Sequence, residues 1–296
     1  MGYLLILFTI ILFSTLEVTG KLIGSDISPF AITIYRFLIG GVLILPFAIN
    51  QKRKSKLKLG VKDYLKLSTP GIINVTFAML FLQLAVAYGE ASISAILVSS
   101  NSIFVAIFAS IIFKEKLTPT KIVSLMLGVF GLSLIIFQEH GSATTATNPV
   151  LGIVFGCLAA VSFGFYTVIS KKYVQEYGNF VTNAVSFLIG ALVLLVISLI
   201  AGFDVTFEPT TSNLLFIGYL GIFVSGLAYL TFFEGLKRVP TTVGAMFFFL
   251  KPIIASALAY FLFGETLTSI QLIGIGIVIV GVNISVIKNL STKRKR

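Results

Sequence analysis

The sequence has little of what most catalytic and metal-binding sites require. Its 296 residues include a single cysteine, Cys157, and a single histidine, His140. A lone cysteine cannot form an intramolecular disulfide, and one Cys with one His cannot supply a metal cluster or a catalytic triad. The glycines do not follow a phosphate-binding loop pattern either. We therefore expect no metal, no cofactor and no enzymatic activity.

Charge is also scarce. Only 11% of the residues are charged, 57% are hydrophobic, and the mean hydropathy is +1.04. A soluble domain has about a quarter of its residues charged, so this chain could not build a wetted surface. Apolar runs of about twenty residues recur, each long enough to cross a hydrocarbon core of about 30 Å. The fold class that we predict is an all-α polytopic membrane protein.

Ten apolar runs can be recognised along the chain. They lie at about 3–23, 29–49, 65–88, 92–113, 119–138, 150–170, 180–201, 213–236, 242–263 and 269–288. Lipid offers no partner to an unpaired backbone group, so each spanning run must be helical. The first run is too long for the apolar part of a signal peptide and has no basic residue before it, so we interpret it as a first transmembrane helix.

Basic residues are distributed asymmetrically between the predicted loops. Segments 50–66, 114–121, 171–172, 237–238 and 288–296 hold 19 of the 22 Lys and Arg residues, and the opposite side holds only Lys21. The positive-inside rule then predicts cytoplasmic N- and C-termini, in the plasma membrane of a prokaryote. The net charge of +11 reflects this topology, so we expect no nucleic-acid partner; the basic C-terminal end suits anionic lipid.

The two halves of the chain resemble each other at an offset of 150 residues. The sequence FLIG occurs at 37–40 and again at 187–190, and FKEKLT at 113–118 corresponds to FGETLT at 263–268. We predict two repeats, 1–141 and 149–296, of five helices each. Because five is odd, the second repeat must be inverted in the membrane, which is a common plan of secondary transporters.

Four stretches carry a resemblance to a known family. They are IYRFLIGG at 34–41, FKEKLT at 113–118, LKPIIASALAYFLFGETLT at 250–268 and GIGIVIVGV at 274–282. With these the chain resembles the ten-helix, EamA-type branch of the drug/metabolite transporter superfamily. The resemblance implies a central cavity and movement of a small metabolite, often an amino acid or amphipathic cation, frequently outward. The family often has Trp in helices one and six; this chain has none, so Phe or Tyr must supply any aromatic wall.

Lys251 is the most informative charged residue, because it lies within an apolar run and is followed by Pro252. A lysine at mid-membrane costs about 2.5–3.5 kcal/mol and usually faces the bundle interior or a wet cavity. Pro252 removes a backbone donor and favours a break in the helix. We expect Lys251 to bind an anionic or carbonyl group of the substrate or to carry a proton. The alternative is a buried ion pair that holds its helix.

Two further charges lie inside the first two runs. Glu17 can form a proton or cation site, but Lys21 one turn later can also pair with it. Arg36, near the outer end of its run, can reach the membrane interface. We favour a structural anchor over substrate contact for Arg36, and we leave both interpretations open for Glu17.

The remaining candidates are polar residues and helix-end carboxylates. Glu115 and Glu265 occupy equivalent positions in the two repeats and are predicted to fasten or gate helix ends. The predicted substrate-binding set also contains Asn101, which is equivalent to Lys251, together with Gln83, Ser94, Tyr166 and Tyr229. Each of these could instead form an interhelical hydrogen bond.

The sequence therefore predicts a secondary transporter that moves a small organic metabolite by alternating access, most simply as an exporter. A channel, a flippase for a lipid-linked solute and an uptake permease are the alternatives. The expected partners are a small-molecule substrate and the lipid bilayer, with proton coupling as an option, and the chain is expected to be a monomer or a homodimer.

Overall fold

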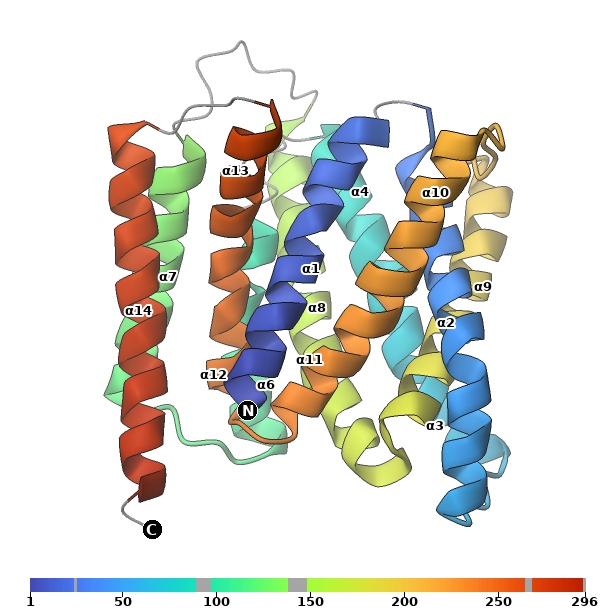
Figure 1. Cartoon of the computed structure of the whole chain (residues 1–296), viewed down its shortest axis with the longest axis horizontal. Coiled ribbons are helices and arrows are strands. Elements are labelled where there is room, and N and C mark those ends of the chain that lie inside the picture. Colours follow the sequence, from blue (N-terminus) through green and yellow to red (C-terminus); the bar gives the residue numbers. More distant parts are fainter. Residues whose placement is uncertain (24–25, 89–96, 138–147, 264–267, 295–296) are drawn as a thin grey trace. The chain divides into compact units, whose positions relative to one another are not determined.

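The computed structural model describes residues 1–23, 26–88, 97–137, 148–263 and 268–294. This part of the chain is helical apart from its connections and one isolated β-bridge between Ile27 and Phe207 (Figure 1). The all-α fold class is therefore confirmed for the described residues.

The helices follow the predicted runs closely. In the first half they are α1 (Gly2–Ile23), α2 (Pro29–Lys54), α3 (Val61–Gly71), the π-helix η1 (Ile72–Ala78), α4 (Met79–Tyr88), α6 (Asn101–Ile112) and α7 (Pro119–Phe137). In the second half they are α8 (Pro149–Tyr177), α9 (Asn179–Ala201), α10 (Thr211–Tyr219), the π-helix η2 (Leu220–Leu227), α11 (Ala228–Leu236), α12 (Thr241–Ala245), the 3₁₀-helix η3 (Met246–Phe249), α13 (Leu250–Phe263) and α14 (Ser269–Arg294).

Among the described residues, 7 helical segments are long and apolar enough to cross a membrane. The segments Gly2–Leu16, Leu97–Ile112 and Pro119–Ile135 are shorter apolar helices. The chain is a multi-pass membrane protein, and the count of ten spans stays a prediction.

Helix ends differ from the predicted runs where the chain is polar. Helix α2 continues to Lys54, α8 to Tyr177 and α14 to Arg294, because a basic turn beyond the hydrocarbon core can remain helical. At its start, α2 is fixed by Ser28, whose side chain accepts a hydrogen bond from the Ala31 amide at 3.1 Å, with Pro29 in the first turn. Such a cap satisfies a donor that the helix itself leaves unpaired.

The chain forms two compact units. Unit 1 contains Met1–Gln83 and Tyr166–Arg238, and unit 2 contains Leu84–Phe165 and Val239–Arg296. Each unit therefore combines segments from both halves of the sequence. The predicted division at 1–141 and 149–296 concerns the sequence repeat and stays a prediction.

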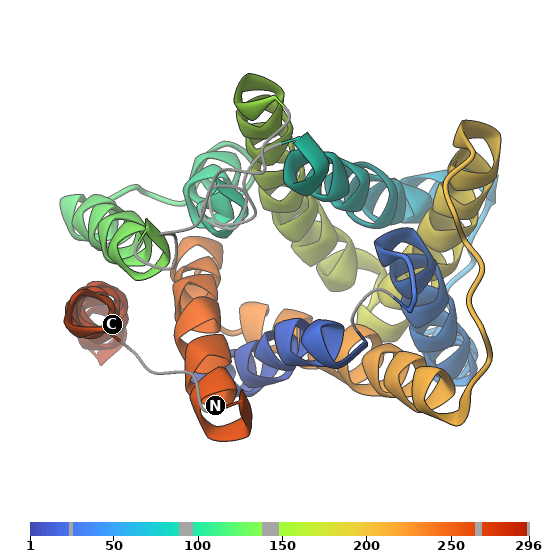
Figure 2. The same ribbon diagram turned by 90° about the horizontal axis from the view of Figure 1, so that it is seen from above.

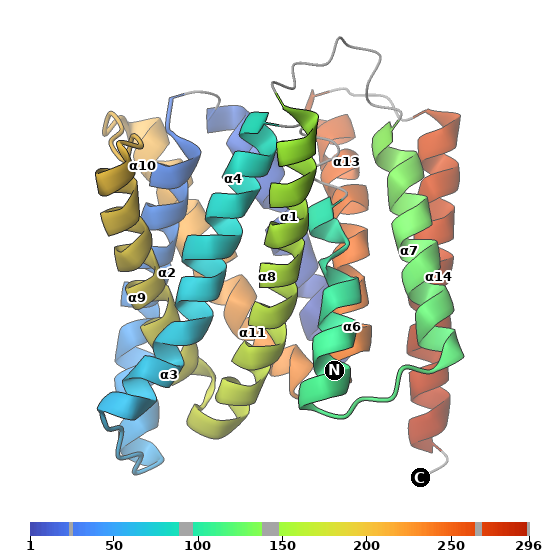
Figure 3. The same cartoon turned by 180° about the vertical axis from the view of Figure 1, so that it is seen from behind.

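Within unit 1, α2 packs against α9 and η2, and α1 packs against α11, as seen from above in Figure 2. The continuous run of α3, η1 and α4 begins at α9 and is clearest in Figure 3. Within unit 2, α7 and α14 lie side by side in Figures 1 and 3, and α12 packs on α6.

The offset of 150 residues recurs in the closest backbone contacts. A Cβ placed on Gly40 would lie 3.1 Å from the Gly221 carbonyl oxygen, and a Cβ on Gly190 would lie 2.5 Å from that of Gly71. The two pairs are equivalent under the repeat, because Gly190 lies 150 residues after Gly40 and Gly71 lies 150 residues before Gly221. Unit 2 repeats the relation, since a Cβ on Gly131 would lie 2.7 Å from the Gly274 oxygen and one on Gly281 would lie 3.1 Å from the Ser124 oxygen. Small residues let helix backbones approach this closely in membranes.

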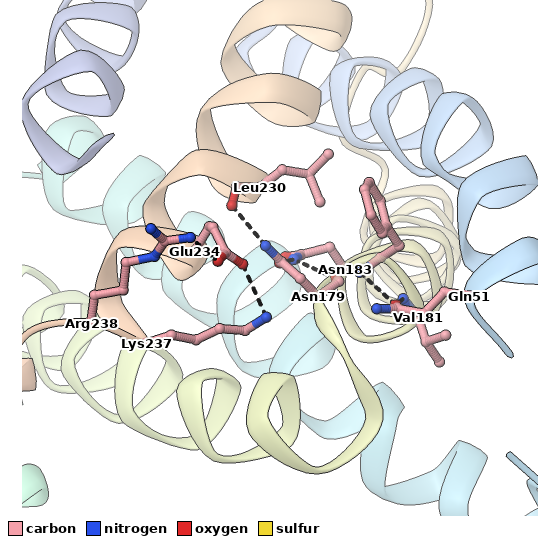
Figure 4. Close-up of polar contacts among 9 residues, drawn as sticks. Gln51, Asn179, Val181, Asn183, Leu230, Glu234, Lys237 and Arg238 are labelled. Carbon is pink, nitrogen blue, oxygen red and sulfur yellow. Dashed lines mark hydrogen bonds and ion pairs between the residues drawn. The ribbon is translucent and has the colours of Figure 1, made fainter. Parts of the chain in front are cut away.

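One end of unit 1 gathers the polar connections between helices (Figure 4). The Gln51 side-chain oxygen accepts hydrogen bonds from the amides of Phe180 and Val181 at 3.1 and 3.2 Å, at the start of α9. At the end of α11, Glu234 pairs with Lys237 at 3.0 Å and with Arg238 at 2.9 Å. Two of the basic residues predicted to be cytoplasmic, Lys237 and Arg238, therefore lie at the same end of unit 1 as the start of α9. The orientation of the chain in the membrane stays a prediction.

Candidate functional site

Unit 1 contains a buried aromatic cluster centred on Tyr229. Its ring centroid lies 4.9 Å from that of Phe13, 5.1 Å from Phe187 and 5.6 Å from Phe37. The contacts are edge-to-face or tilted, the arrangement that aromatic quadrupoles prefer. Phe37 and Phe187 are equivalent under the repeat and lie 5.0 Å apart. Rings from α1, α2, α9 and α11 thus meet at one place.

Two predicted binding residues are brought together in this cluster. Tyr166 lies 6.2 Å from Tyr229 between ring centroids and 5.9 Å from Phe233, with its side chain buried. The Asn74 amide donates to the Tyr229 hydroxyl at 3.5 Å, the long limit of a hydrogen bond. The cluster therefore combines aromatic faces with neutral hydrogen-bonding groups.

Two π-helical segments border the cluster. The segment η1 carries Asn74, and η2 leads directly into α11 and Tyr229. The segment η1 begins directly after Gly71, and η2 begins at Leu220. The two starting positions are therefore separated by almost the repeat length of 150 residues. π-Helical turns are rare and occur frequently at functional sites, because they widen the helix and change which side chains face inward. Sequence reasoning did not find these segments, since apolar periodicity does not distinguish a π-turn from an α-turn.

Arg36 lies inside unit 1. The prediction that it reaches the membrane interface was wrong, because its side chain is only 3% exposed. Its guanidinium carbon lies 4.6 Å from the centre of the Phe37 ring, and one terminal nitrogen lies 3.7 Å from the Met79 sulfur. Contact with an aromatic face offsets part of the desolvation of a buried cation. Arg36 therefore adjoins the aromatic cluster through Phe37.

Unit 2 contains interruptions of two apolar helices at equivalent positions. In the first, Ser100 has a turn conformation immediately before α6. In the second, the 3₁₀-helix η3 ends at Phe249, directly before Leu250. Ser100 and Leu250 are 150 residues apart. A 3₁₀-helical turn thus precedes Pro252, and a turn at the equivalent place lies beside Ser102, where no proline is present. The predicted effect of Pro252 on its helix stays a prediction.

The interruptions carry the predicted polar residues of unit 2. Lys251 and Pro252 are the second and third residues of α13, and both side chains are partly buried. Asn101 opens α6 and is buried. The neighbouring Ser102 hydroxyl donates to the Ala245 carbonyl at 2.8 Å, just where α12 gives way to η3. A side chain of α6 thus satisfies a backbone group at the break of the other helix.

Glu115 joins the two halves of the sequence inside unit 2. Its carboxylate accepts hydrogen bonds from the amides of Thr241 and Thr242, at 2.6 and 3.2 Å, and from the Thr242 hydroxyl at 3.0 Å. Lys121 lies 3.6 Å away. The carboxylate therefore caps the N-terminus of α12, where the helix dipole favours a negative charge. The predicted role as a fastener has a direct geometric basis here, and gating stays a prediction.

The other predicted residues are less defined. Gln83, in α4, is partly buried and belongs to unit 1. The backbone of Glu17 lies in α1, but its side chain is outside the described part of the structure, as are Ser94 and Glu265. The structure thus brings Tyr166 and Tyr229 together in unit 1, and it assigns Lys251, Pro252, Asn101 and Glu115 to unit 2.

Comparison with known proteins bears directly on the two halves of the sequence. The model of the EamA-like transporter family matches residues 1–137 and 150–287. The chain belongs to this family. The family consists of membrane transporters and not of enzymes, and its match in two segments agrees with the repeated elements of this EamA-family chain.

Individual relatives agree with this assignment. A Clostridium kluyveri protein described as an uncharacterized transporter is 35% identical, over 99% of this chain and 94% of its own length. A chloroplastic WAT1-related protein of Arabidopsis thaliana is 26% identical, over 86% of this chain and 62% of its own. One crystal structure has a TM-score of 0.84 at 19% identity and covers 98% of both chains, which shows a shared fold.

Proposed function

We propose that this EamA-family chain is a secondary transporter that exports a small organic metabolite across the plasma membrane of a prokaryote by alternating access. The observation that carries the proposal is the pairing of helix interruptions. The π-segments η1 and η2 overlap under the repeat, and the turn at Ser100 corresponds to Leu250, where η3 gives way to α13. Interrupted helices in corresponding positions of two repeats are the usual setting of a transporter binding site.

The proposed topology has ten membrane spans in two inverted repeats, with both termini in the cytoplasm. The basic residues support this orientation, because those of unit 1 gather where α2 and α11 end and α9 begins. A segment with this excess of Lys and Arg is retained on the cytoplasmic side. Attachment of a topology reporter at either terminus tests the orientation.

The proposed substrate is an amino acid or another amphipathic metabolite. The aromatic cluster of unit 1 suits an apolar or cationic portion, and Asn74 with Tyr229 offers neutral hydrogen-bonding groups. Lys251 of unit 2 is proposed to bind an anionic or carbonyl group or to carry a coupling proton. No nucleic acid is involved in this scheme, and the functional form is a monomer or a homodimer.

The first experiment is an untargeted metabolite profile of the medium from cells that overproduce the wild-type chain. Cells with an empty vector, with Lys251→Ala, and with Lys116→Ala are grown in parallel. Lys116 is an exposed lysine of the same unit, so the last variant controls for loss of a lysine as such. All variants are first compared for membrane abundance and for elution as a single species in detergent.

Export predicts a metabolite that accumulates outside with the wild type and with Lys116→Ala, and that falls to the empty-vector level with Lys251→Ala. Accumulation that is unchanged in a well-folded Lys251→Ala variant rejects the role of Lys251. Identical profiles in all four cultures reject export of common metabolites and favour uptake, or flipping of a lipid-linked solute, or a channel.

A further inference from the structure

A cavity of about 650 Å³ lies at the basic end of unit 1, away from the aromatic cluster. It is formed by the last turns of α2, the connection to α3, and the first turns of α9. The lining residues are Leu45, Ala48, Ile49, Lys52, Arg53, Lys56, Leu57, Lys58, Leu59, Tyr64, Val181 and Val185.

The cavity lining changes from apolar to cationic along a single stripe of α2. Residues 45, 48, 49, 52 and 53 line it, and this spacing of three and four places them on one helix face. Leu45 and Ile49 form the apolar portion and are 38% and 45% exposed. Lys52 and Arg53 follow one turn later, in the basic last turn of α2. The stripe therefore complements an anionic phospholipid. Its cationic residues lie where a headgroup would bind, and its apolar residues lie where an acyl chain would bind.

The connection after α2 folds back and adds two more cations. The Leu57 amide donates to the Lys52 carbonyl at 3.1 Å, and the Lys56 amide donates to the Arg53 carbonyl at 3.2 Å. These two bonds form a Schellman motif, in which the residue at the position of Lys56 adopts a left-handed conformation and is usually glycine. Lys56 has a φ of 51°. A non-glycine residue costs roughly 1–2 kcal/mol there, so Lys56 holds a strained conformation that glycine would relieve.

The described lining of the cavity carries a net positive charge. The lining contains no Asp or Glu among the residues that the structure describes. Asp63, in the first turn of α3, accepts from the Gly60 amide at 2.9 Å and from the Tyr177 hydroxyl at 3.0 Å. Lys52 donates to the Tyr64 hydroxyl at 3.2 Å, a neutral partner. The two Schellman bonds are accepted by the Lys52 and Arg53 carbonyls.

We propose that this cavity is a binding site for an anionic phospholipid, whose phosphodiester contacts Lys52, Arg53, Lys56 and Lys58 and whose acyl chain covers Leu45 and Ile49. Basic pockets beside membrane helices bind such headgroups. A soluble phosphate would meet only the cations and would leave the exposed apolar stripe uncovered. The site is separate from the proposed transport function and does not depend on it.

The test is a titration of the purified full-length chain in detergent with phosphatidylglycerol, followed by native mass spectrometry of the bound lipid. Zwitterionic phosphatidylcholine and inorganic phosphate serve as the comparison ligands. The first variant is Lys56→Gly, which removes one cation and relieves backbone strain. Its matched control is Lys114→Gly, because Lys114 is a lysine of unit 2 with a similar φ of 54°.

We expect Lys56→Gly to fold at least as stably as the wild type and to bind phosphatidylglycerol about fivefold more weakly, the equivalent of about 1 kcal/mol per cation at a membrane surface. Combining it with Arg53→Gln and Lys58→Gln should weaken binding roughly a hundredfold, on the same scale. Lys114→Gly should bind like the wild type, and phosphatidylcholine should not bind detectably.

Two results would overturn the proposal. One is equal affinity for phosphatidylglycerol in the wild type, Lys56→Gly and the triple variant. The other is displacement of the lipid by inorganic phosphate at comparable concentration, which would identify a site for soluble anions that does not use the apolar stripe.

Discussion

Each unit caps the N-terminus of a helix from the second half of the sequence with a side chain from the first half, but the two caps differ in charge. In unit 1 the neutral amide of Gln51 accepts from Phe180 and Val181 at the start of α9. In unit 2 the carboxylate of Glu115 accepts from Thr241 and Thr242 at the start of α12. A carboxylate is the stronger cap, because it adds a charge interaction with the helix dipole.

The difference follows from what surrounds each cap. Glu115 lies 3.6 Å from Lys121, so its charge is partly balanced within unit 2. Gln51 is followed by Lys52, Arg53 and Lys54. A carboxylate there would neutralise cations that the neutral amide leaves available for an anionic ligand. Both side chains thus cap a helix N-terminus, but only Glu115 adds a negative charge to its surroundings.

The largest effect on stability is expected at glycines where two helix backbones approach each other closely. A Cβ on Gly71, in unit 1, would lie 1.8 Å from the Ser186 carbonyl oxygen, whereas one on Gly131, in unit 2, would lie 2.7 Å from that of Gly274. Because backbone must move in both cases, we expect Gly71→Ala to lower the free energy of unfolding by about 3 kcal/mol, the upper part of the usual overpacking range. Gly131→Ala should cost less, at about 1–2 kcal/mol.

Thermal unfolding in one detergent, followed by size-exclusion chromatography, measures this difference. Gly218→Ala is the control, because nothing lies within 4 Å of a Cβ there, and alanine is the better helix former. If Gly71→Ala unfolds at the temperature of Gly218→Ala, the close approach of α3 to α9 is incorrect.

The second prediction compares the caps directly. Glu115→Ala removes acceptors from three donors and leaves them unsatisfied in a partly buried place, so we expect a loss of about 2–3 kcal/mol. Gln51→Ala removes a neutral acceptor and should cost about 1 kcal/mol. The two unfolding midpoints are measured under identical conditions. Equal losses would mean that the charge of Glu115 contributes nothing to its cap.

Much of this architecture could be predicted from the sequence, because hydropathy reports burial in lipid over twenty-residue windows. The helices were predicted on that basis, whereas the offset of 150 residues was predicted from repeated sequence blocks and the break near Pro252 from the missing backbone donor of proline. The turn at Ser100 was not, because serine carries no backbone restriction. The π-segments were also missed, since they preserve the same apolar composition.

Side-chain partners were harder to predict than helices. Arg36 was expected to extend to the interface, and the burial of its guanidinium beside Phe37 depends on the three-dimensional meeting of α2, α9 and α11. Tyr166 and Tyr229 were predicted separately, and only the fold brings their rings together. Gln51 gave no signal in a basic loop, because a cap between distant helices has no local sequence pattern.

The third prediction converts one cap into the other. Gln51→Glu keeps the shape of the side chain and places a carboxylate at the N-terminus of α9, which should stabilise unit 1 by about 0.5–1 kcal/mol. The same variant should bind phosphatidylglycerol more weakly than the wild type, because a negative charge now adjoins Lys52. Unfolding and lipid titration are measured on one preparation. A loss of stability as large as that of Gln51→Ala would contradict the proposed equivalence of the two caps.

The smallest effect is expected at a third connection, between α9 and α10 of unit 1. Asp204 accepts hydrogen bonds from the Thr206 amide at 2.9 Å and from its hydroxyl at 2.8 Å. The amide bond, followed by the hydroxyl bond, lowers the pKa of Asp204 below its ordinary value.

A carboxyl group with a lowered folded-state pKa stabilises the protein above its unfolded pKa of about 3.9, and the contribution disappears as the pH falls through the folded-state value. Asp204→Asn should therefore shift the unfolding midpoint slightly and constantly between about pH 7 and pH 5, and the difference from the wild type should shrink as the pH falls below about 4. A difference that instead grows on acidification would show that Asp204 is not the group that holds this turn.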